Sequence, residues 1–565
     1  MRKEDGKTGK MILNLFLSHK KYLLGIFMCL ISMSAFSFIQ PLIIRKITDA
    51  GMLEKNMYYI VLYSSILLFI SMMYQMTDIL QARLFTKIHN EITFSLYDLS
   101  YWKINKMKIE YYHEKEGAEI LHTISNDIGH ISSVTDQLTT YSITAILQVI
   151  GGGVGLAVLN WKLAILVILF IPIKLVLVHF FSNKKRNVTE YMLENERNFF
   201  KWMGERIDGI REMKLWDLFQ VKYYEFKKLQ NSMMKSYYES CMLDKYKGTS
   251  ISILDAVLDV IVYILCGWLI VKSNFTIGSA FAFITYSGYV ATPITFLADI
   301  KYYFAEIKPS AKRFKEFMEL PEEAGLNVQP QKDSAVCIKK ANNSNKPAII
   351  EFINVQFGYE ANMPILQNIN LSIYAGEKIA IIGENGSGKS TLLNLLTGFY
   401  QADKGSIKVN GRLINEWGVE YIRAKISVLW QNPYIFNETI EENINIDRKA
   451  SHQKVIMSCR QSGAINFINR LDGGFEYCVG SNGAKLSGGE RQKLGLARTL
   501  TKQAEILVLD EATSGIDKES NKEIVDLLCK ELKNKTIIFI THRYEELENI
   551  DKVYKLAHGK LEVVK

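Results

Sequence analysis

The stretch KIAIIGENGSGKSTLLNLL, residues 378–396, decides the fold of the second half of this chain. It contains Gly383, four further residues, and then Gly388, Lys389 and Ser390, with an apolar run before the loop and a helix-forming run after it. Glycines at this spacing let backbone N–H groups turn inward around phosphate oxygens, and the N-terminus of the following helix adds the positive end of its dipole. The stretch therefore predicts a strand, a phosphate-binding loop and a helix, in which Lys389 supplies a point charge and the Ser390 hydroxyl ligates Mg²⁺.

A second apolar run, ILVLDE at residues 506–511, ends in two carboxylates. A strand next to a phosphate-binding loop commonly ends in an aspartate that holds Mg²⁺, and Asp510 fits this role. Glu511 follows directly and is placed to act as the general base that polarises an attacking water. The alternative is a pair of solvated carboxylates at the end of a strand, which the phosphate-binding loop upstream disfavours.

The first 300 residues differ from this part of the chain, because long uncharged runs crowd them. A helix needs about 20 apolar residues to cross the hydrocarbon of a bilayer. Six runs reach that length, at residues 22–44, 57–77, 137–161, 163–183, 248–271 and 273–298. We therefore expect a polytopic α-helical membrane domain over residues 1–320, with six transmembrane helices.

The charged segments between these runs indicate the topology. Residues 78–136 and 184–247 are long and rich in Lys and Arg, and the first 21 residues hold six basic residues. Because Lys and Arg concentrate on the cytoplasmic side, both termini and both long loops are predicted to lie in the cytoplasm. The net charge of +9 is then explained by these loops and not by nucleic-acid binding. Apolar residues at helical spacing predict that the membrane helices continue through the long loops as rods, the alternative being a small separate domain in each loop.

The remaining chain is predicted to form a linker and one further domain. Residues 321–348 are polar, lack periodicity and contain three prolines, as is typical of a linker. Over residues 349–565 short β-like runs alternate with helical ones, which predicts an α/β domain around the phosphate-binding loop. The seven cysteines are scattered and include no CxxC pair, which argues against a disulfide framework and a zinc site.

The stretch LSGGERQ, residues 486–492, lies between the two phosphate motifs in the chain. Together the three motifs resemble the nucleotide-binding domain of ABC transporters. The resemblance implies that Tyr359 stacks on adenine, that Gln431 lies near Mg²⁺, and that His542 contacts the γ-phosphate of ATP. It assigns ATP binding to Tyr359, Gly383, Asn385, Gly386, Ser387, Gly388, Lys389, Ser390, Thr391, Ser487, Gly488, Gly489, Asp510 and Asp517, Mg²⁺ binding to Ser390, Gln431 and Asp510, and catalysis to Glu511, His542 and Gln431.

Six spans followed by one such domain resemble a bacterial type IV, B-subfamily-like exporter half-transporter over residues 11–565. In that family each long cytoplasmic loop carries a short coupling helix that docks on a nucleotide-binding domain, and residues 110–128 and 204–217 resemble these two loops. The resemblance also implies that Ser487 meets ATP bound to a second subunit. Two complete sites then require a dimer, either with a second copy of the chain or with a related half-transporter.

The chain departs from the family pattern at two places. Ser481 stands where exporters commonly carry a Glu that contacts the coupling helices, and Gly515 and Ile516 replace the usual Ala-Leu of the D-loop. These departures concern the coupling between the nucleotide-binding domain and the membrane domain. The residues expected to bind and hydrolyse ATP are all present. About 21 residues precede the first span, so we expect no leader-cleaving peptidase domain.

The resemblance implies an ATP-hydrolysing exporter of the plasma membrane that works by alternating access across the bilayer. Its substrate is expected to be hydrophobic or amphipathic, such as a peptide, a lipid or a drug. One alternative is an importer of a metal chelate with the same fold. Another is an ATP-gated channel or regulatory subunit, against which the intact catalytic residues count.

Three charged residues, Lys174, Asp255 and Asp259, lie inside the predicted spans. A carboxylate at the centre of a span costs about 2.5–3.5 kcal/mol on the insertion scale. At 1.5 Å per residue, Lys174 and Asp259 fall at roughly the same depth, whereas Asp255 lies nearer the cytoplasmic end. One interpretation is that Asp259 pairs with Lys174 for structure. The other is that both carboxylates line a cavity and bind a cationic part of the substrate.

Overall fold

The computed structural model describes residues 19–114, 117–133, 137–273, 275–323, 348–360, 363–414, 418–511, 528–541 and 550–564. The chain forms two compact units. The first comprises Met1–Trp102 and Gly117–Leu320, and the second comprises Lys103–Glu116 and Pro321–Lys565. A short segment of the first long loop therefore belongs to the C-terminal unit.

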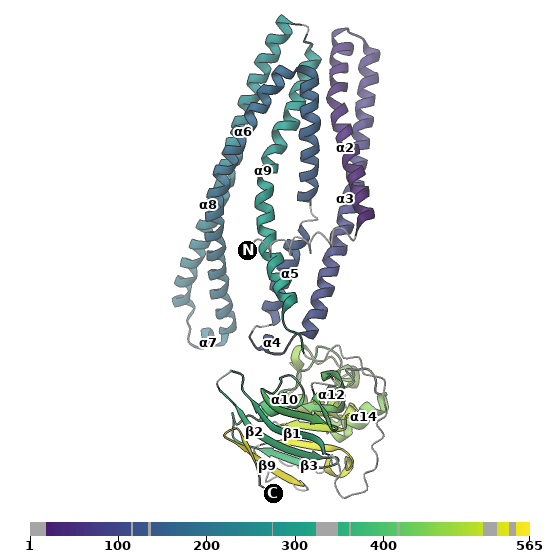
Figure 1. Ribbon diagram of the computed structural model, residues 1–565, viewed down its shortest axis with the longest axis vertical. Helices are drawn as coiled ribbons and strands as arrows, with labels where there is room; N and C mark the ends of the chain where they lie inside the picture. Colours follow the sequence, from purple (N-terminus) through teal and green to yellow (C-terminus); the bar gives the residue numbers. More distant parts are fainter. Residues whose placement is uncertain are drawn as a thin grey trace. The chain divides into compact units, whose positions relative to one another are not determined.

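The first unit is helical, and several of its helices are long (Figure 1). They are α2 (Lys20–Lys46), the π-helical η1 (Ile47–Leu53), α3 (Met57–Lys106), α5 (Gly117–Ser132), α6 (Gln137–Asp208), α7 (Ile210–Leu215), α8 (Phe219–Lys272) and α9 (Ile277–Glu319). Among the described residues, five helices are long and apolar enough to cross a membrane. With 50 residues in α3 and 54 in α8, these helices far exceed the roughly 20 residues that a crossing needs. The membrane helices thus continue as rods through the charged segments, as predicted.

Helix α6 accounts for two crossings, because it folds back at Asn160. This residue has φ −163° and ψ 103°, and its side-chain oxygen accepts hydrogen bonds from the N–H groups of Lys162 and Leu163 at 3.1 and 3.2 Å. On one side of the break, a Cβ added to Gly152 would lie 3.2 Å from the Tyr286 carbonyl of α9. On the other side, Lys174 reaches the carbonyl of the nearby Ala291 on α9. A straight helix would hold residues 152 and 174 about 33 Å apart. Because both residues contact the same part of α9, the chain must reverse its direction between them.

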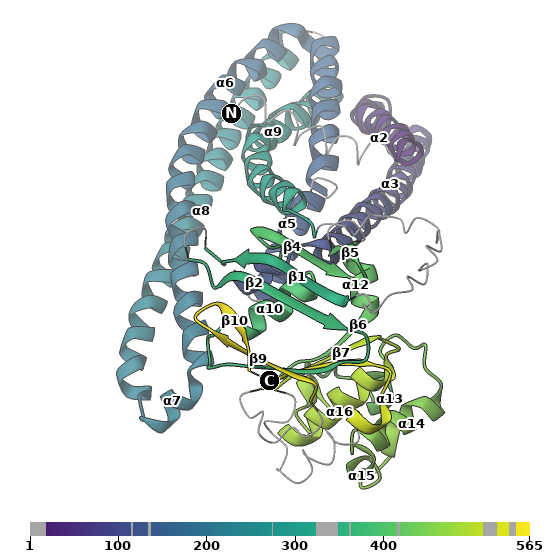
Figure 2. The same cartoon turned by 60° about the horizontal axis from the view of Figure 1, so that its bottom comes forward.

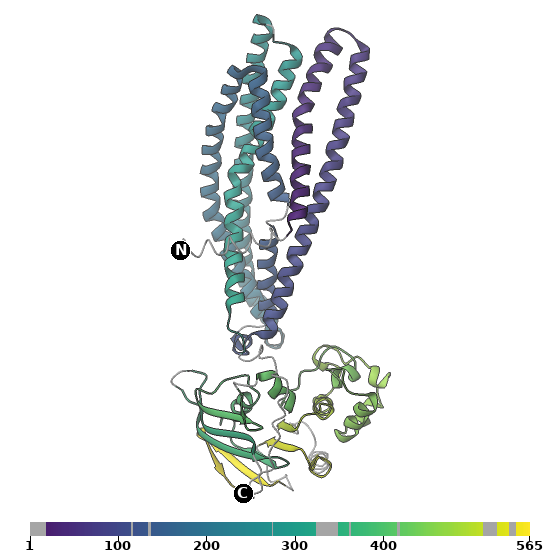
Figure 3. The same cartoon turned by 45° about the vertical axis from the view of Figure 1, so that its right-hand side comes forward.

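Small residues let the helices of this unit approach closely. A Cβ added to Gly155 of α6 would lie 2.8 Å from the ring of Tyr286, which is fully buried and donates a hydrogen bond to the Phe38 carbonyl of α2. Helices α2 and α3 run side by side in two views (Figures 1 and 3), with Gly25 of α2 against Leu84 of α3.

The charged residues of the membrane helices pair differently from the prediction. The Lys174 ammonium forms its ion pair with the Asp255 carboxylate of α8 and donates a 2.9 Å hydrogen bond to the Ala291 carbonyl. The prediction that Asp259 is the partner of Lys174 is therefore wrong. Counting residues gives depth along a helix, but Asp255 and Asp259 are about 6 Å apart along α8. The tilt and rotation of α8 against α6, which packing determines, select between the two carboxylates.

The second unit contains two sheets (Figure 2). A six-stranded sheet has the order β10 (Lys560–Val563), β9 (Lys552–Ala557), β3 (Lys378–Ile382), β8 (Thr536–Ile540), β7 (Ile506–Asp510), β6 (Ile426–Leu429). An antiparallel sheet has the order β2 (Leu366–Tyr374), β1 (Ala348–Phe357), β4 (Lys404–Val409), β5 (Arg412–Leu413). Every residue of β3, β7 and β8 is buried, as expected for parallel strands covered on both faces.

Helices complete this unit. They are α4 (Glu110–Glu114), α10 (Lys389–Leu396), α12 (Val419–Lys425), α13 (Ile440–Ile444), α14 (His452–Gln461), α15 (Ile465–Ile468) and α16 (Gly488–Thr501). Helices α13 to α16 gather in one place (Figure 2) and share a separate apolar core that includes Ile440, Val455, Phe467 and Leu494. The prediction of a helical membrane region followed by an α/β P-loop domain is confirmed.

Candidate nucleotide-binding site

The loop between β3 and α10 has the backbone of a phosphate cradle. Gly386 has φ +80° and Gly388 has φ +102°, a region that residues with a Cβ rarely adopt. A Cβ added to Gly383 would lie 2.5 Å from the Leu556 carbonyl and 2.6 Å from the Ser387 hydroxyl. The glycines thus allow a tight loop that ends directly at the N-terminus of α10, where backbone N–H groups favour an anion.

The side chains of this loop also suit a phosphate. The Lys389 ammonium is buried and donates to the carbonyl oxygens of Gly383 and Glu384 at 2.8 and 2.9 Å. The buried hydroxyl oxygen of Ser387 has no hydrogen-bond partner among the described residues. A cation whose partners among the described residues are neutral oxygens, and a hydroxyl with no described partner, are both groups that phosphate oxygens would satisfy.

Strand β7 brings two carboxylates to the same edge of the sheet. Asp510 is buried, and burial, followed by the nearby Glu511 carboxylate, raises the pKa of Asp510 to about 6 against an opposing effect of Lys389. The Gln431 side-chain amide donates a 2.6 Å hydrogen bond to Glu511. These two residues are 80 positions apart, and the parallel pairing of β6 with β7 explains why they meet.

Tyr359 follows strand β1 and stands beside the helix of the phosphate cradle. Its hydroxyl lies 3.3 Å from the Thr391 hydroxyl, its ring is half exposed, and it packs edge-on against Tyr400, with ring centroids 5.1 Å apart. An exposed aromatic ring next to a phosphate cradle offers a face on which a base can stack. The contribution of Tyr400 was not predicted, because no motif marks this residue in the sequence.

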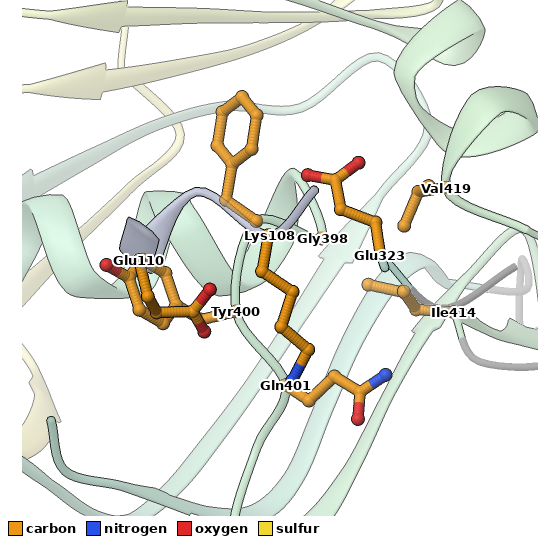
Figure 4. Close-up of a pocket in the computed structure, with 9 residues that line it drawn as sticks. Lys108, Glu110, Glu323, Gly398, Tyr400, Gln401, Ile414 and Val419 are labelled. Atoms are coloured by element: carbon orange, nitrogen blue, oxygen red, sulfur yellow. The ribbon is translucent and has the colours of Figure 1, made fainter. Parts of the chain in front are cut away.

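Helix α4 of the first long loop packs onto the same unit. Figure 4 shows a pocket in which Glu110 of α4 lies beside Tyr400, and Lys108 points toward Gln401. Burial, and after it the nearby Tyr359 and Glu110, raise the pKa of the Tyr400 phenol. The loop that resembles a coupling segment therefore contacts Tyr400, whose ring packs against Tyr359.

The chain that leaves α9 reinforces this docking. Arg423 of α12 forms two hydrogen bonds with the Glu323 carboxylate, at 2.8 and 3.0 Å, and a third with the Thr397 carbonyl at the end of α10. Lys103, near the end of α3, pairs with Glu322 at 3.0 Å. These ion pairs tie Lys103–Glu116 to the region just after the phosphate cradle. They could not be predicted from a local pattern, because all the partners are distant along the chain.

The signature stretch forms the N-terminus of α16. Ser487 caps this helix reciprocally with Glu490: its hydroxyl accepts from the Glu490 N–H at 3.3 Å, and its own N–H donates to the Glu490 carboxylate at 2.8 Å. Ser487 and Gly488 are exposed, while Gly489 is half-buried. The free face of a capped helix N-terminus is suited to an anion brought by another molecule.

Two of the predicted site residues, Asp517 and His542, lie outside the described residues. Strand β8, which precedes His542 in the chain, ends between β3 and β7. Ser481 is exposed in a short 3₁₀ turn before the signature. The described site thus unites Tyr359, the phosphate loop, Gln431, Asp510 and Glu511 at one edge of the six-stranded sheet.

Comparisons with known proteins agree with this geometry. The family model described as "ABC transporter transmembrane region" matches residues 23–294, and the family model described as "ABC transporter" matches residues 366–514. The two regions are joined in one chain.

Related proteins match most of the chain. The "ATP-dependent lipid A-core flippase" of Hahella chejuensis is 30% identical over 477 residues, which cover 81% of this chain and 79% of the relative. The "Uncharacterized ABC transporter ATP-binding protein YwjA" of Bacillus subtilis is 28% identical over 483 residues, which cover 84% and 80%. The solved structure of a bacterial Atm1-family ABC exporter with ATP bound is similar in fold, with a TM-score of 0.80 and 21% identity over 96% of this chain and 94% of that chain.

The phosphate cradle, the paired carboxylates, the signature helix and the membrane-spanning helices thus occur together in one chain, as they do in its relatives. The protein binds ATP, and its ATPase activity is coupled to transport across a membrane. The chain belongs to the ABC transporter family, with its transmembrane region and its nucleotide-binding domain fused in a single polypeptide.

Proposed function

We propose that this transporter is an exporter of the plasma membrane, which acts as a dimer of two copies and moves a hydrophobic or amphipathic molecule out of the cytoplasm. The observation that carries the proposal is the similarity, over about four fifths of both chains, to relatives named for flipping a lipid. The Lys- and Arg-rich extensions of α3 and α8 favour a nucleotide-binding domain on the cytoplasmic side.

Two features support a dimer. The exposed cap residue Ser487 and the N–H groups of Gly488 and Gly489 form an anion site that suits ATP held by the second subunit. In the second long loop, α7 ends at Leu215 and Trp216, whose side chains are 81% and 73% exposed. An exposed Leu–Trp pair at the tip of a helical hairpin suits docking on another domain.

In this proposal ATP binding draws two nucleotide-binding domains together, and the helices α4 and α7 transmit the closure to the membrane helices. Lys389 and the loop N–H groups bind the phosphates, while Glu511 orients and deprotonates the attacking water. Mg²⁺ fits the site, because Ser390, Asp510 and Gln431 offer the oxygen ligands that this ion prefers. Its chemical contribution is to neutralise phosphate charge. The proposed roles of Asp517 and His542 remain predictions from the family resemblance.

The raised pKa of Asp510 predicts a pH dependence for the binding of Mg²⁺ with nucleotide. A carboxyl with a pKa of about 6 is charged above that pH and becomes neutral as the pH falls through it. The affinity for a non-hydrolysable ATP analogue with Mg²⁺ should therefore fall about fivefold between pH 6 and pH 5, because the charged fraction of the carboxyl falls from about one half to about one eleventh as one proton competes with the metal.

The variant Asp510→Asn is the control for this titration, because the nucleotide phosphates titrate equally in both proteins. Equilibrium binding across pH 5–8 should show a smaller decrease in the variant than in the wild type. Identical pH profiles would contradict the assignment of Asp510 as a metal ligand.

The export proposal is tested in proteoliposomes of defined lipid. Amphipathic probes that stimulate ATP hydrolysis should move from the leaflet on the nucleotide-domain side to the opposite leaflet, and only in the presence of ATP and Mg²⁺. A headgroup-labelled phospholipid, quenched from the outside, reports this movement directly. ATP-dependent movement in the reverse direction would favour an importer, and ion current without probe movement would favour a channel.

A further inference from the structure

The membrane helices contain a charged cluster that the ATP cycle does not use. The Lys174 side chain is 1% exposed and is held by the Asp255 carboxylate and the Ala291 carbonyl. Asp259 lies one turn farther along α8 and is exposed in the helical unit. No described cation pairs with Asp259, so one lysine faces two carboxylates and a net negative charge remains.

The cluster lies deep within the apolar length of the helices. Counted from the ends of the helices at Lys272, Ile277 and Lys162, residues 259, 291 and 174 lie about 20, 21 and 18 Å inward, in a hydrocarbon core of about 30 Å. Helices α6, α8 and α9 therefore place Lys174, Asp259 and the Ala291 carbonyl at a similar depth in the membrane. At this depth an ionisable side chain almost always faces the bundle interior, a water-filled cavity or a partner charge.

A second polar group in the same region has no partner. Ser287 lies on α9, one turn before Ala291 and on the same side of the helix. It is 1% exposed, and its hydroxyl oxygen forms no hydrogen bond with the described residues. A buried hydroxyl without a partner is costly unless a water or a ligand satisfies it. Helix α9, whose Ala291 carbonyl accepts the hydrogen bond from Lys174, thus offers an additional buried hydroxyl one turn away.

The position of Asp259 on α8 determines which charge is accessible. Leu258 and Val262, its neighbours on the helix, are 1% and 2% exposed and pack into the core with α6 and α9. Asp255 is half-buried and already engaged, whereas Asp259 stands at the edge of this buried face. The Lys174–Asp255 ion pair therefore holds α6 against α8, and Asp259 is the carboxylate of this cluster that can bind a ligand.

We propose that Asp259 is a binding site for the positively charged group of an amphipathic substrate, so that this exporter prefers amphiphiles that carry an ammonium group over uncharged ones. The inference rests on the proposed export function. An ammonium group neutralises the charge that Lys174 leaves unpaired, and its methylene or methyl groups suit the apolar surroundings. The Ser287 hydroxyl is then available to accept a hydrogen bond from a bound amine or from a water beside it.

The test uses the full-length transporter in liposomes of phosphatidylglycerol, whose headgroup carries no amine. ATP hydrolysis is titrated with dodecyltrimethylammonium and with uncharged 1-dodecanol. We expect Asp259→Asn to raise the half-maximal stimulating concentration of the cation about tenfold, which corresponds to about 1.4 kcal/mol, and to leave that of the alcohol unchanged. Asp259→Glu keeps the charge and should keep the preference.

Asp244→Asn is the matched control, because Asp244 lies on the charged extension of the same helix, where it pairs with Lys185. Thermal stability and basal hydrolysis of each variant establish that it is folded. An unchanged response of Asp259→Asn to the cation overturns the inference, and so does an equal loss of response to both probes, since that result indicates a structural role. ATP hydrolysis without ATP-driven movement of either probe would instead contradict the export function itself.

Discussion

Replacing Glu511 by glutamine is expected to abolish ATP hydrolysis while leaving ATP binding intact. The phosphate cradle, Lys389 and Asp510 are untouched in this variant, so the nucleotide should bind with unchanged affinity. The amide can still accept the 2.6 Å hydrogen bond that Gln431 donates to the carboxylate. What it lacks is the basicity needed to take a proton from the attacking water. Since general bases contribute about 10²–10⁴-fold, steady-state phosphate release should fall by at least about 10²-fold.

The measurement combines phosphate release with equilibrium binding of nucleotide on the same preparation in lipid. In the proposed dimer, this variant should also retain ATP after rapid removal of free nucleotide, because the closed state cannot be left by hydrolysis. Glu562→Gln is the matched control: it makes the same chemical change at an exposed residue of strand β10 and should behave as the wild type. Near-normal turnover of Glu511→Gln would show that another group positions the water.

The second large effect is expected from Ser487→Arg, which places a bulky cation on the exposed N-terminus of α16. A cation is unfavourable at the positive end of a helix dipole and blocks the anion site there. A dimer of two such chains should lose hydrolysis. The loss of the cap itself destabilises the helix by about 1 kcal/mol, which must be separated from the loss of the site.

Thr439→Arg provides that separation, because Thr439 caps α13 with the same reciprocal bonds to Glu442 that Ser487 makes to Glu490. This control loses a cap in the same helical region without touching the signature. It should keep most of the hydrolysis rate, whereas Ser487→Arg should not.

Mixed dimers with two affinity tags then test whether the signature acts on the other subunit. Lys389→Ala removes the charge of the phosphate cradle. When Lys389→Ala and Ser487→Arg are on opposite chains, both fall in one composite site and the other site stays intact. When both are on the same chain, each composite site loses one element and hydrolysis should disappear. The reverse pattern would show that the signature serves its own chain.

Much of the nucleotide site could be predicted because its parts are contiguous in the chain. Residues 383–390 form one loop, and its glycines allow the backbone to fold around a phosphate whatever surrounds it. The carboxylates Asp510 and Glu511 follow a fully buried strand, which is visible as an apolar run. The six apolar runs could also be identified from the sequence, since the thickness of the bilayer sets the length of a spanning helix.

Other contacts depend on which elements lie side by side. The hydrogen bond between Gln431 and Glu511 exists because β6 pairs with β7, and the contact of α4 with Tyr400 exists because Lys103–Glu116 packs with the C-terminal unit. Neither Tyr400 nor the Arg423–Glu323 pair has a local pattern, because their partners come from distant parts of the chain.

The amino-acid sequence by itself determined that this chain has membrane-spanning helices, an ATP-binding loop and a charged cluster within the membrane, because each follows from local composition and spacing. Only the tertiary structure decided that Lys174 pairs with Asp255, and that Asp259 forms no ion pair with the residues that the structure describes. Residue counting places a side chain along a helix axis, and the two aspartates differ by a single turn. The choice between them depends on the tilt and rotation that α6, α8 and α9 adopt when their side chains pack against each other.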